Sequence, residues 1–163
     1  MVPKYKDFLT KELPTMLRTL EGDQEPNFGL MTAQHMVEHL IYVTKSIAKR
    51  RGEPKDDPTK SQRYFRKFID AGAPFEYRPK DGVTKENLND LRSPNMEAAI
   101  QGLEAATNQF YELFESNPNH RSYNDMMGEF DLTELELFNY QHGRWHAHQF
   151  GLIEKFSAAE VVA

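Results

Sequence analysis

The sequence predicts an all-α protein, specifically a four-helix bundle with one short extra helix and a long crossing loop. Two observations support this class: four long stretches repeat apolar residues at three- and four-residue steps, and no stretch shows a convincing period of two. A chain of 163 residues is long enough to bury one sizeable core. We therefore expect residues 1–163 to form a single domain.

The first half of the chain is expected to hold two long helices and the short one. Residues 3–20 form the first helix, in which Pro14 predicts a kink or a break. The second begins after Thr32 as N-cap and ends with a basic turn before Gly52. A charged, proline-bearing loop then leads to the short helix, whose apolar residues are Tyr64, Phe65, Phe68 and Ile69.

The second half begins with the long crossing segment, residues 71–92, which is irregular apart from a helical turn near residues 85–91. Ser93 as N-cap and Pro94 as first helical residue predict the third long helix. A loop is expected at residues 117–124. Thr133 and Glu136 offer a capping box for the last helix, which is expected to span residues 132–156.

Composition excludes several classes of function. The 20 basic and 25 acidic residues give a net charge of −5, which attracts neither nucleic acid nor an anionic membrane surface. The sequence shows no membrane span and no signal-peptide pattern, so we expect a cytoplasmic protein without membrane partners. Because the chain has no cysteine, histidine and carboxylate side chains must hold any metal.

The last helix carries two histidines in the middle of its apolar face. His142 and His146 lie about 40 degrees apart on a helical wheel, whereas His148 lies on the far side and is expected to be exposed. An unpaired buried imidazole costs roughly 1–3 kcal/mol, so both rings need partners. At this spacing they can share one metal ion, or each can bond a backbone carbonyl or a buried hydroxyl.

The second helix offers a third imidazole. His39 lies at the margin of its apolar stripe, and His35 lies about 40 degrees further toward solvent. His39 is therefore the better candidate for pointing inward, either as a metal ligand from a facing helix or as a satisfied core histidine. Glu38 is expected at the surface. Thr107, in the stripe of the third long helix, either bonds carbonyls of its own helix or faces the histidines.

Two motifs carry a family resemblance. MTAQHMVEHL at residues 31–40, paired with YQHGRWHAHQFGL at residues 140–152, resembles the DinB/YfiT-like superfamily of metal-dependent enzymes, and most of all a DinB-related branch. The resemblance implies a homodimeric bundle that holds one divalent ion, zinc or nickel, through His39, His142 and His146. Trp145 departs from the family pattern, because many members have a further histidine there.

Three histidine ligands leave a coordination position open for water or substrate, which is typical of catalytic sites. Water at such a position can have a pKa of about 7, which favours hydrolysis. A thiol there would lose its proton, and the resemblance implies S-transferases that use a low-molecular-weight thiol on a small-molecule substrate. The alternatives are a non-catalytic metal-binding bundle and a metal-free dimerising bundle.

The sequence identifies no general base. His35 is a candidate for the rim of the site, as a proton shuttle or occasional fourth ligand, although a surface histidine is the commoner outcome. Gln149 is a candidate partner of a ligand imidazole. Phe110, Trp145 and Phe150 either line a pocket or belong to the core.

Overall fold

The computed structural model describes residues 1–73, 75, 82–157 and 160, and most of these residues are helical. The predicted helical class is confirmed, with the addition of a two-stranded antiparallel sheet that was not predicted. In the described residues, no helix is both long enough and apolar enough to cross a membrane.

The N-terminal helical segment consists of α1 (Pro3–Asp7), a π-helical stretch (Phe8–Glu12) and α2 (Leu13–Leu17). The predicted effect of Pro14 is thus a change of winding rather than a break. Pro14 donates no hydrogen bond and its ring crowds the carbonyl four residues before it. The turn before it is wider, because the N–H of Leu13 bonds the carbonyl of Phe8.

Helix α3 (Ala33–Ile47) begins where predicted, since the side chain of Thr32 accepts a hydrogen bond from the His35 N–H. It ends several residues before Gly52, however. The chain leaves the helix there because the next residues pair with a strand: the N–H of Arg51 donates to the carbonyl of Tyr123 at 2.7 Å.

Helix α4 (Lys60–Ala71) is the predicted short helix. A capping box between Thr59 and Gln62 opens it, and Gly72 closes it in the left-handed conformation at φ 60°. Part of the predicted crossing segment, residues 74 and 76–81, lies outside the described residues. The predicted helical turn is a 3-10 turn at Lys85–Asn87.

Helix α5 (Met96–Ser116) starts later than predicted. Its N-cap is Asn95, whose side chain accepts from the N–H of Ala98 at 2.9 Å, so Ser93 and Pro94 precede the helix. The loop predicted at residues 117–124 is wrong in its second half. There β1 (Arg121–Asn124) pairs with β2 (Gly128–Asp131).

Helix α6 (Leu132–Gln149) is the predicted histidine helix, but both of its ends differ. The capping box is formed by Asp131 and Glu134 rather than by Thr133 and Glu136. The helix stops at Gln149 because Gly151 turns into the left-handed region at φ 71°, and the N–H of Leu152 bonds back to the carbonyl of Ala147.

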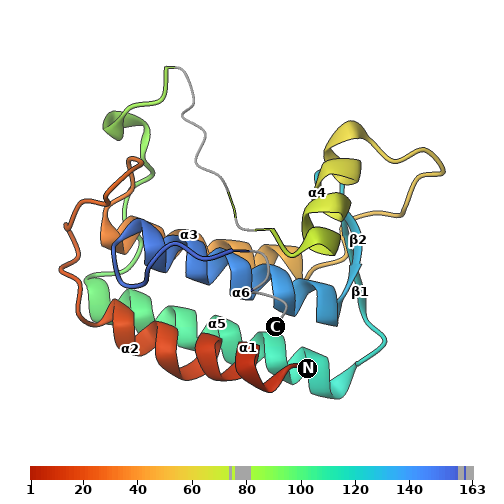
Figure 1. Cartoon of the computed structure of the whole chain (residues 1–163), viewed down its shortest axis with the longest axis horizontal. Coiled ribbons are helices and arrows are strands. Elements are labelled where there is room, and N and C mark those ends of the chain that lie inside the picture. The colour runs from red at the N-terminus through yellow and green to blue at the C-terminus, as the bar shows by residue number, and fades with distance from the viewer. Residues whose placement is uncertain (74, 76–81, 158–159, 161–163) are drawn as a thin grey trace.

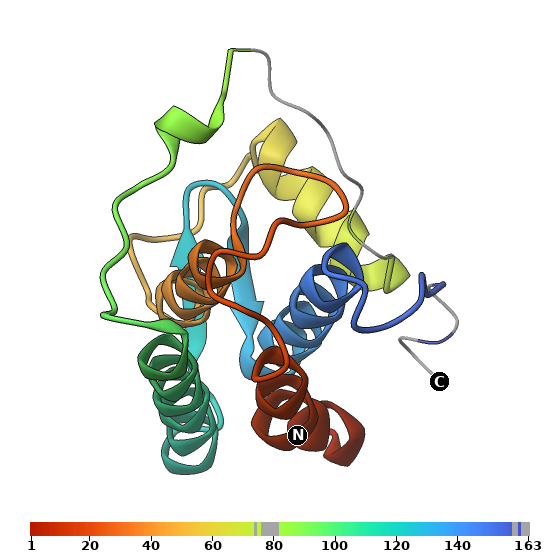
Figure 2. The same cartoon turned by 90° about the vertical axis from the view of Figure 1, so that its left-hand side faces the viewer.

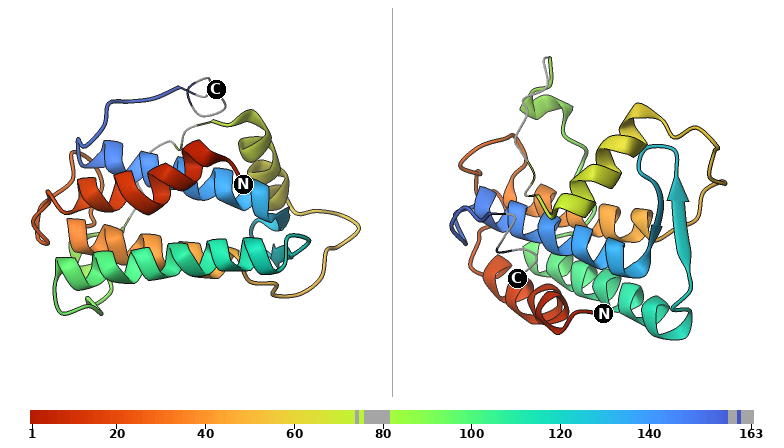
Figure 3. Two further views of the ribbon diagram at one scale, coloured as in Figure 1. Left: turned by 90° about the horizontal axis from the view of Figure 1, so that it is seen from below. Right: turned by 45° about the vertical axis from the view of Figure 1, so that its right-hand side comes forward.

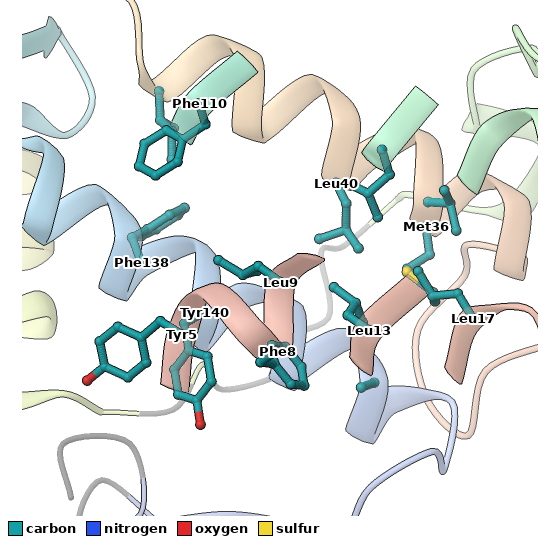
Figure 4. Packing of buried hydrophobic residues seen from close by; sticks show 14 of the residues in the cluster. Tyr5, Phe8, Leu9, Leu13, Leu17, Met36, Leu40, Phe110, Phe138 and Tyr140 are labelled. Atoms are coloured by element: carbon teal, nitrogen blue, oxygen red, sulfur yellow. The ribbon is translucent and has the colours of Figure 1, made fainter. Parts of the chain in front are cut away.

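The long helices form two layers (Figure 1). Helices α3 and α6 lie in one layer, and α5 and the N-terminal segment lie in the other, as the view along their axes shows (Figure 2). Helix α4 stands against α6 and β2, outside these layers (Figure 3). The core fills the space between the layers, and Figure 4 shows its labelled members, which include Leu9, Leu13, Met36, Leu40 and Phe138.

Candidate metal centre

Three imidazoles from two helices converge inside the helical layers. The Nε2 atom of His142 lies 3.1 Å from Nε2 of His39 and 3.0 Å from Nε2 of His146. One ring nitrogen from each residue lies within 4.8 Å of the other two. The structure thus brings together the three histidines that the sequence singled out on α3 and α6.

Helix α6 places two of the rings because four residues make about one turn, which brings the ring of His146 edge to face with that of His142, 4.6 Å between centroids. The backbone between them approaches the N-terminal segment closely. A Cβ atom at Gly143 would lie 3.0 Å from Cδ2 of Leu13 and 3.2 Å from Cε1 of Phe8. Glycine therefore sets how deep this part of α6 sits, and with it the depth of both histidines.

Helix α3 supplies the third ring with a different degree of burial. His142 is 6% exposed and His146 is 4% exposed, whereas His39 is half-buried. Burial lowers the pKa of His146 to about 3 and that of His142 well below its ordinary value. The pKa of His39 is lowered by the same cause. All three rings are therefore neutral at pH 7, which is the state that binds metal.

A chain of hydrogen bonds determines which nitrogen of His146 carries the proton. The Gln149 amide donates from Nε2 to the carbonyl of Phe28 at 2.7 Å, so its Oε1 faces Nδ1 of His146, also at 2.7 Å. An amide oxygen only accepts, so Nδ1 of His146 is protonated. Its Nε2 then carries a lone pair, and that lone pair points into the cluster.

Hydrogen bonds alone do not satisfy the cluster. The Nε2 atom of His142 contacts two other ring nitrogens, and a contact between nitrogens is favourable only if one supplies a proton and the other a lone pair. One proton on His142 would have to serve both contacts, and a lone pair there would repel that of His146. A cation at the centre would accept the lone pairs of all three rings.

The geometry of the cluster fits a divalent ion. Imidazole ligands at about 2.0–2.1 Å from zinc in a tetrahedral site have their nitrogens about 3.3 Å apart. The two contacts of His142, at 3.0 and 3.1 Å, are slightly shorter than this. An all-imidazole set suits zinc, nickel, copper and iron, so the donor set does not select one metal.

An aromatic wall covers one side of the cluster. The ring of Phe75 lies 5.3 Å from that of His142, and the ring of Phe138 lies 5.6 Å from it. Phe68 packs against Phe75 at 4.5 Å, which connects this wall to α4. The wall keeps water away from His142.

The other described side, at His39, faces a pocket of about 460 Å³. The lining residues come from the residue before the α3 N-cap, from α3 and from residues 88–92: Met31, His35, Glu38, His39, Tyr42, Leu88, Asn89, Asp90 and Arg92. Glu38, expected as a surface carboxylate, is half-buried and accepts hydrogen bonds from the backbone of the opposite wall. Burial raises its pKa, but these bonds outweigh that effect and hold the pKa below its ordinary value.

The remaining candidates lie around the cluster. His35 is half-buried in the pocket wall, where its Nε2–H donates to the Asn89 carbonyl and Thr32 bonds its Nδ1, so neither nitrogen is free. Trp145 packs on Phe28. The prediction that His148 is exposed is wrong: it is half-buried, and its Nδ1 contacts the carbonyl of Ile153 at 3.3 Å.

Thr107 is buried in α5. Among the described residues, the aromatic side chains that pack against His142 are those of Phe75 and Phe138. Sequence reasoning missed Phe75 and the role of Glu38. The wheel of α3 does not reveal Glu38, because its partners lie more than fifty residues further along the chain.

Comparison of the chain with protein-family models, with curated proteins and with solved structures finds no match.

Proposed function

We propose that the protein is a metal-dependent enzyme of the DinB/YfiT-like type, a four-helix bundle that holds one divalent ion, zinc or nickel, through His39, His142 and His146. One observation carries the proposal: Nε2 of His142 has two nitrogen neighbours at 3.0–3.1 Å, and no placement of protons on the three rings makes both contacts full hydrogen bonds. The burial of both α6 histidines strengthens it, since unpaired buried polar groups are costly.

A bound ion would supply Lewis acidity at an open coordination position. The residues of the chain would orient the ligands, exclude water and admit the substrate. Gln149 orients His146 by accepting a hydrogen bond from the imidazole Nδ1–H. Phe75 and Phe138 exclude water from one side, and the pocket at His39 admits a small molecule. These features support either hydrolysis or transfer of a low-molecular-weight thiol, and we propose both as reaction classes to be tested.

The metal content of the purified protein tests the proposal directly. We expect about one divalent ion per chain in the untagged wild-type protein, and none in His142→Ala, measured by inductively coupled plasma mass spectrometry. His148→Ala is the matched control, because it removes an imidazole from the same helix outside the cluster. Equal metal in all three proteins would rule out this site.

Turnover then separates an enzyme from a non-catalytic metal-binding protein. We expect the loaded protein to convert either esters and amides or, with an added cellular thiol, small electrophiles such as epoxides and chlorinated aromatics. His142→Ala should lose this activity together with the metal. A loaded protein inactive in every assay would favour the non-catalytic alternative, and a protein that takes up no metal would favour the metal-free dimerising bundle.

A further inference from the structure

The pocket at His39 is a pre-formed approach to the metal centre. His39 is the half-buried histidine of the three, and it lines this pocket. The volume of the pocket, about 460 Å³, lies within the range of small-molecule sites, about 300–1,000 Å³. A ligand in the pocket therefore meets the cluster on the side that His39 forms.

Hydrogen bonds to α3 fix the far wall of the pocket. The carboxylate of Glu38 accepts from the backbone N–H groups of Arg92 and Ser93, each at 2.9 Å. The Nε2–H of His35 donates to the carbonyl of Asn89 at 3.1 Å. Because Glu38 already accepts these backbone bonds, its charge is partly compensated, and the wall is in place before any ligand arrives.

Arg92 is the unpaired cation of this pocket. Arg92 is an exposed residue of the pocket lining, and among the described residues none forms an ion pair or a hydrogen bond with its guanidinium. The other formal charges in the lining are those of Glu38 and Asp90. Without metal, carboxylates thus outnumber cations. Three neutral imidazoles leave both charges of a divalent ion uncompensated, so the pocket becomes net positive when the ion binds.

We propose that Arg92 binds an anionic group of the substrate. The substrate class is then a small molecule with a carboxylate or a comparable anion at one end and the reacting group, directed to the metal, at the other. Arginine suits this role because its planar guanidinium binds carboxylates through two parallel hydrogen bonds. The inference rests on the proposed function, since the metal supplies the charge that makes the pocket attractive to anions.

A set of dicarboxylates tests the inference without any assay of activity. The protein is loaded with cobalt(II), uptake is confirmed by its visible absorption, and oxalate, malonate, succinate, glutarate and adipate are titrated by calorimetry. We expect one chain length to bind best, at the spacing between metal and guanidinium. Arg92→Ala should weaken that binding about ten- to hundredfold, and Arg92→Lys should weaken it less. Both variants keep the backbone N–H that Glu38 binds.

Arg51→Ala is the matched control, since it removes the same charge from an exposed arginine beyond the end of α3. Its affinity for the best dicarboxylate should equal that of the wild type. The inference is overturned if Arg92→Ala binds as well as the wild type, if both arginine variants weaken equally, or if the metal-free protein binds just as tightly. A wild-type protein that takes up no cobalt overturns the proposed function itself, and the inference falls with it.

Discussion

Helices α6 and α3 hold the histidines of the candidate centre in different ways. On α6, His142 and His146 are buried, and Gln149 fixes the proton of His146 through a bond anchored at the Phe28 carbonyl. On α3, His39 is half-buried and lines an open pocket. The comparison indicates that α6 builds the buried part of the site, while α3 forms the side that faces the pocket.

The largest predicted effect is the loss of metal binding when a histidine is removed from α6 or, in a separate variant, from α3. His146→Ala should reduce metal binding to background, because it leaves one ring on each of two helices. His39→Ala should leave weak residual binding, because His142 and His146 remain aligned on one helix at 3.0 Å. Isothermal titration with zinc measures both affinities. Stronger residual binding in His146→Ala than in His39→Ala would contradict the assignment of roles.

The next effect concerns the partner of His146. Gln149→Leu removes the acceptor that keeps the proton on Nδ1, so zinc affinity should fall about ten- to hundredfold. Gln149→Glu keeps an acceptor and should retain more of the affinity. A second measurement is the tautomer of His146 in the metal-free protein, which nitrogen-15 NMR reports: the wild-type protein should carry the proton on Nδ1.

Gln141→Leu is the control for this prediction. Gln141 is also a buried glutamine of α6 whose Nε2 donates to a backbone carbonyl, that of Ala73, but its Oε1 accepts no hydrogen bond from an imidazole of the described residues. Its replacement should leave zinc affinity and the His146 tautomer unchanged. If Gln149→Leu behaves in the same way, Gln149 does not position the ligand.

The pH dependence of the metal-free protein sharpens the contrast in burial. Because burial lowers the pKa of His142 and His146 in the folded state, the unfolded chain binds more protons below about pH 6.5. The free energy of unfolding should therefore fall as pH decreases from about 6.5 toward 3, by at most about 1.4 kcal/mol per pH unit for each ring. Urea unfolding at several pH values in the presence of a chelator measures this slope.

Variants assign that slope to one helix or the other. His146→Leu should remove more of it than His39→Leu, since His146 is the more buried ring. An equal reduction in the two variants would show that the two sides of the site do not differ in this respect.

The smallest predicted effect is a change in the free energy of unfolding. It tests the close approach of α6 to the N-terminal segment at Gly143, which sets the depth of the α6 histidines. Gly143→Ala should lower the free energy of unfolding by about 1–2 kcal/mol, because the new methyl group meets Leu13 and Phe8 and this strain exceeds the gain in helix propensity. In the matched variant Gly102→Ala, the new Cβ meets only the end of the Ile41 side chain, at 3.1 Å. Its free energy of unfolding should change little, and an equal loss in both variants would contradict the argument.

Local patterns in the sequence were enough for the helices and for the inward face of α6. Thr32 caps α3 as expected, and the four-residue spacing brings His142 and His146 together. Some failures are local, such as the capping box of α6, which Asp131 and Glu134 form two residues before the expected pair. Others depend on contacts between distant residues. Helix α3 stops at Ile47 because the following residues pair with Tyr123, a partner that no local pattern indicates.

The same limit applies to two carboxylates. Glu38 was expected at the surface, but it accepts bonds from the backbone of Arg92 and Ser93. Glu136 was expected in a capping box, but it is fully buried and accepts the hydroxyl hydrogen of Tyr111 at 2.9 Å. Helical periodicity shows which way a side chain points, but it does not show which distant segment packs against it.

The separation of the histidines along the chain has a consequence for folding kinetics. His142 and His146 meet as soon as α6 forms one turn, whereas His39 is 103 residues away from His142 and joins them only when α3 and α6 pack together. Contacts at such separation form slowly. A partly folded chain therefore offers two imidazoles to a metal ion before the third arrives, and an ion captured at that stage would favour the docking of α3 over competing arrangements.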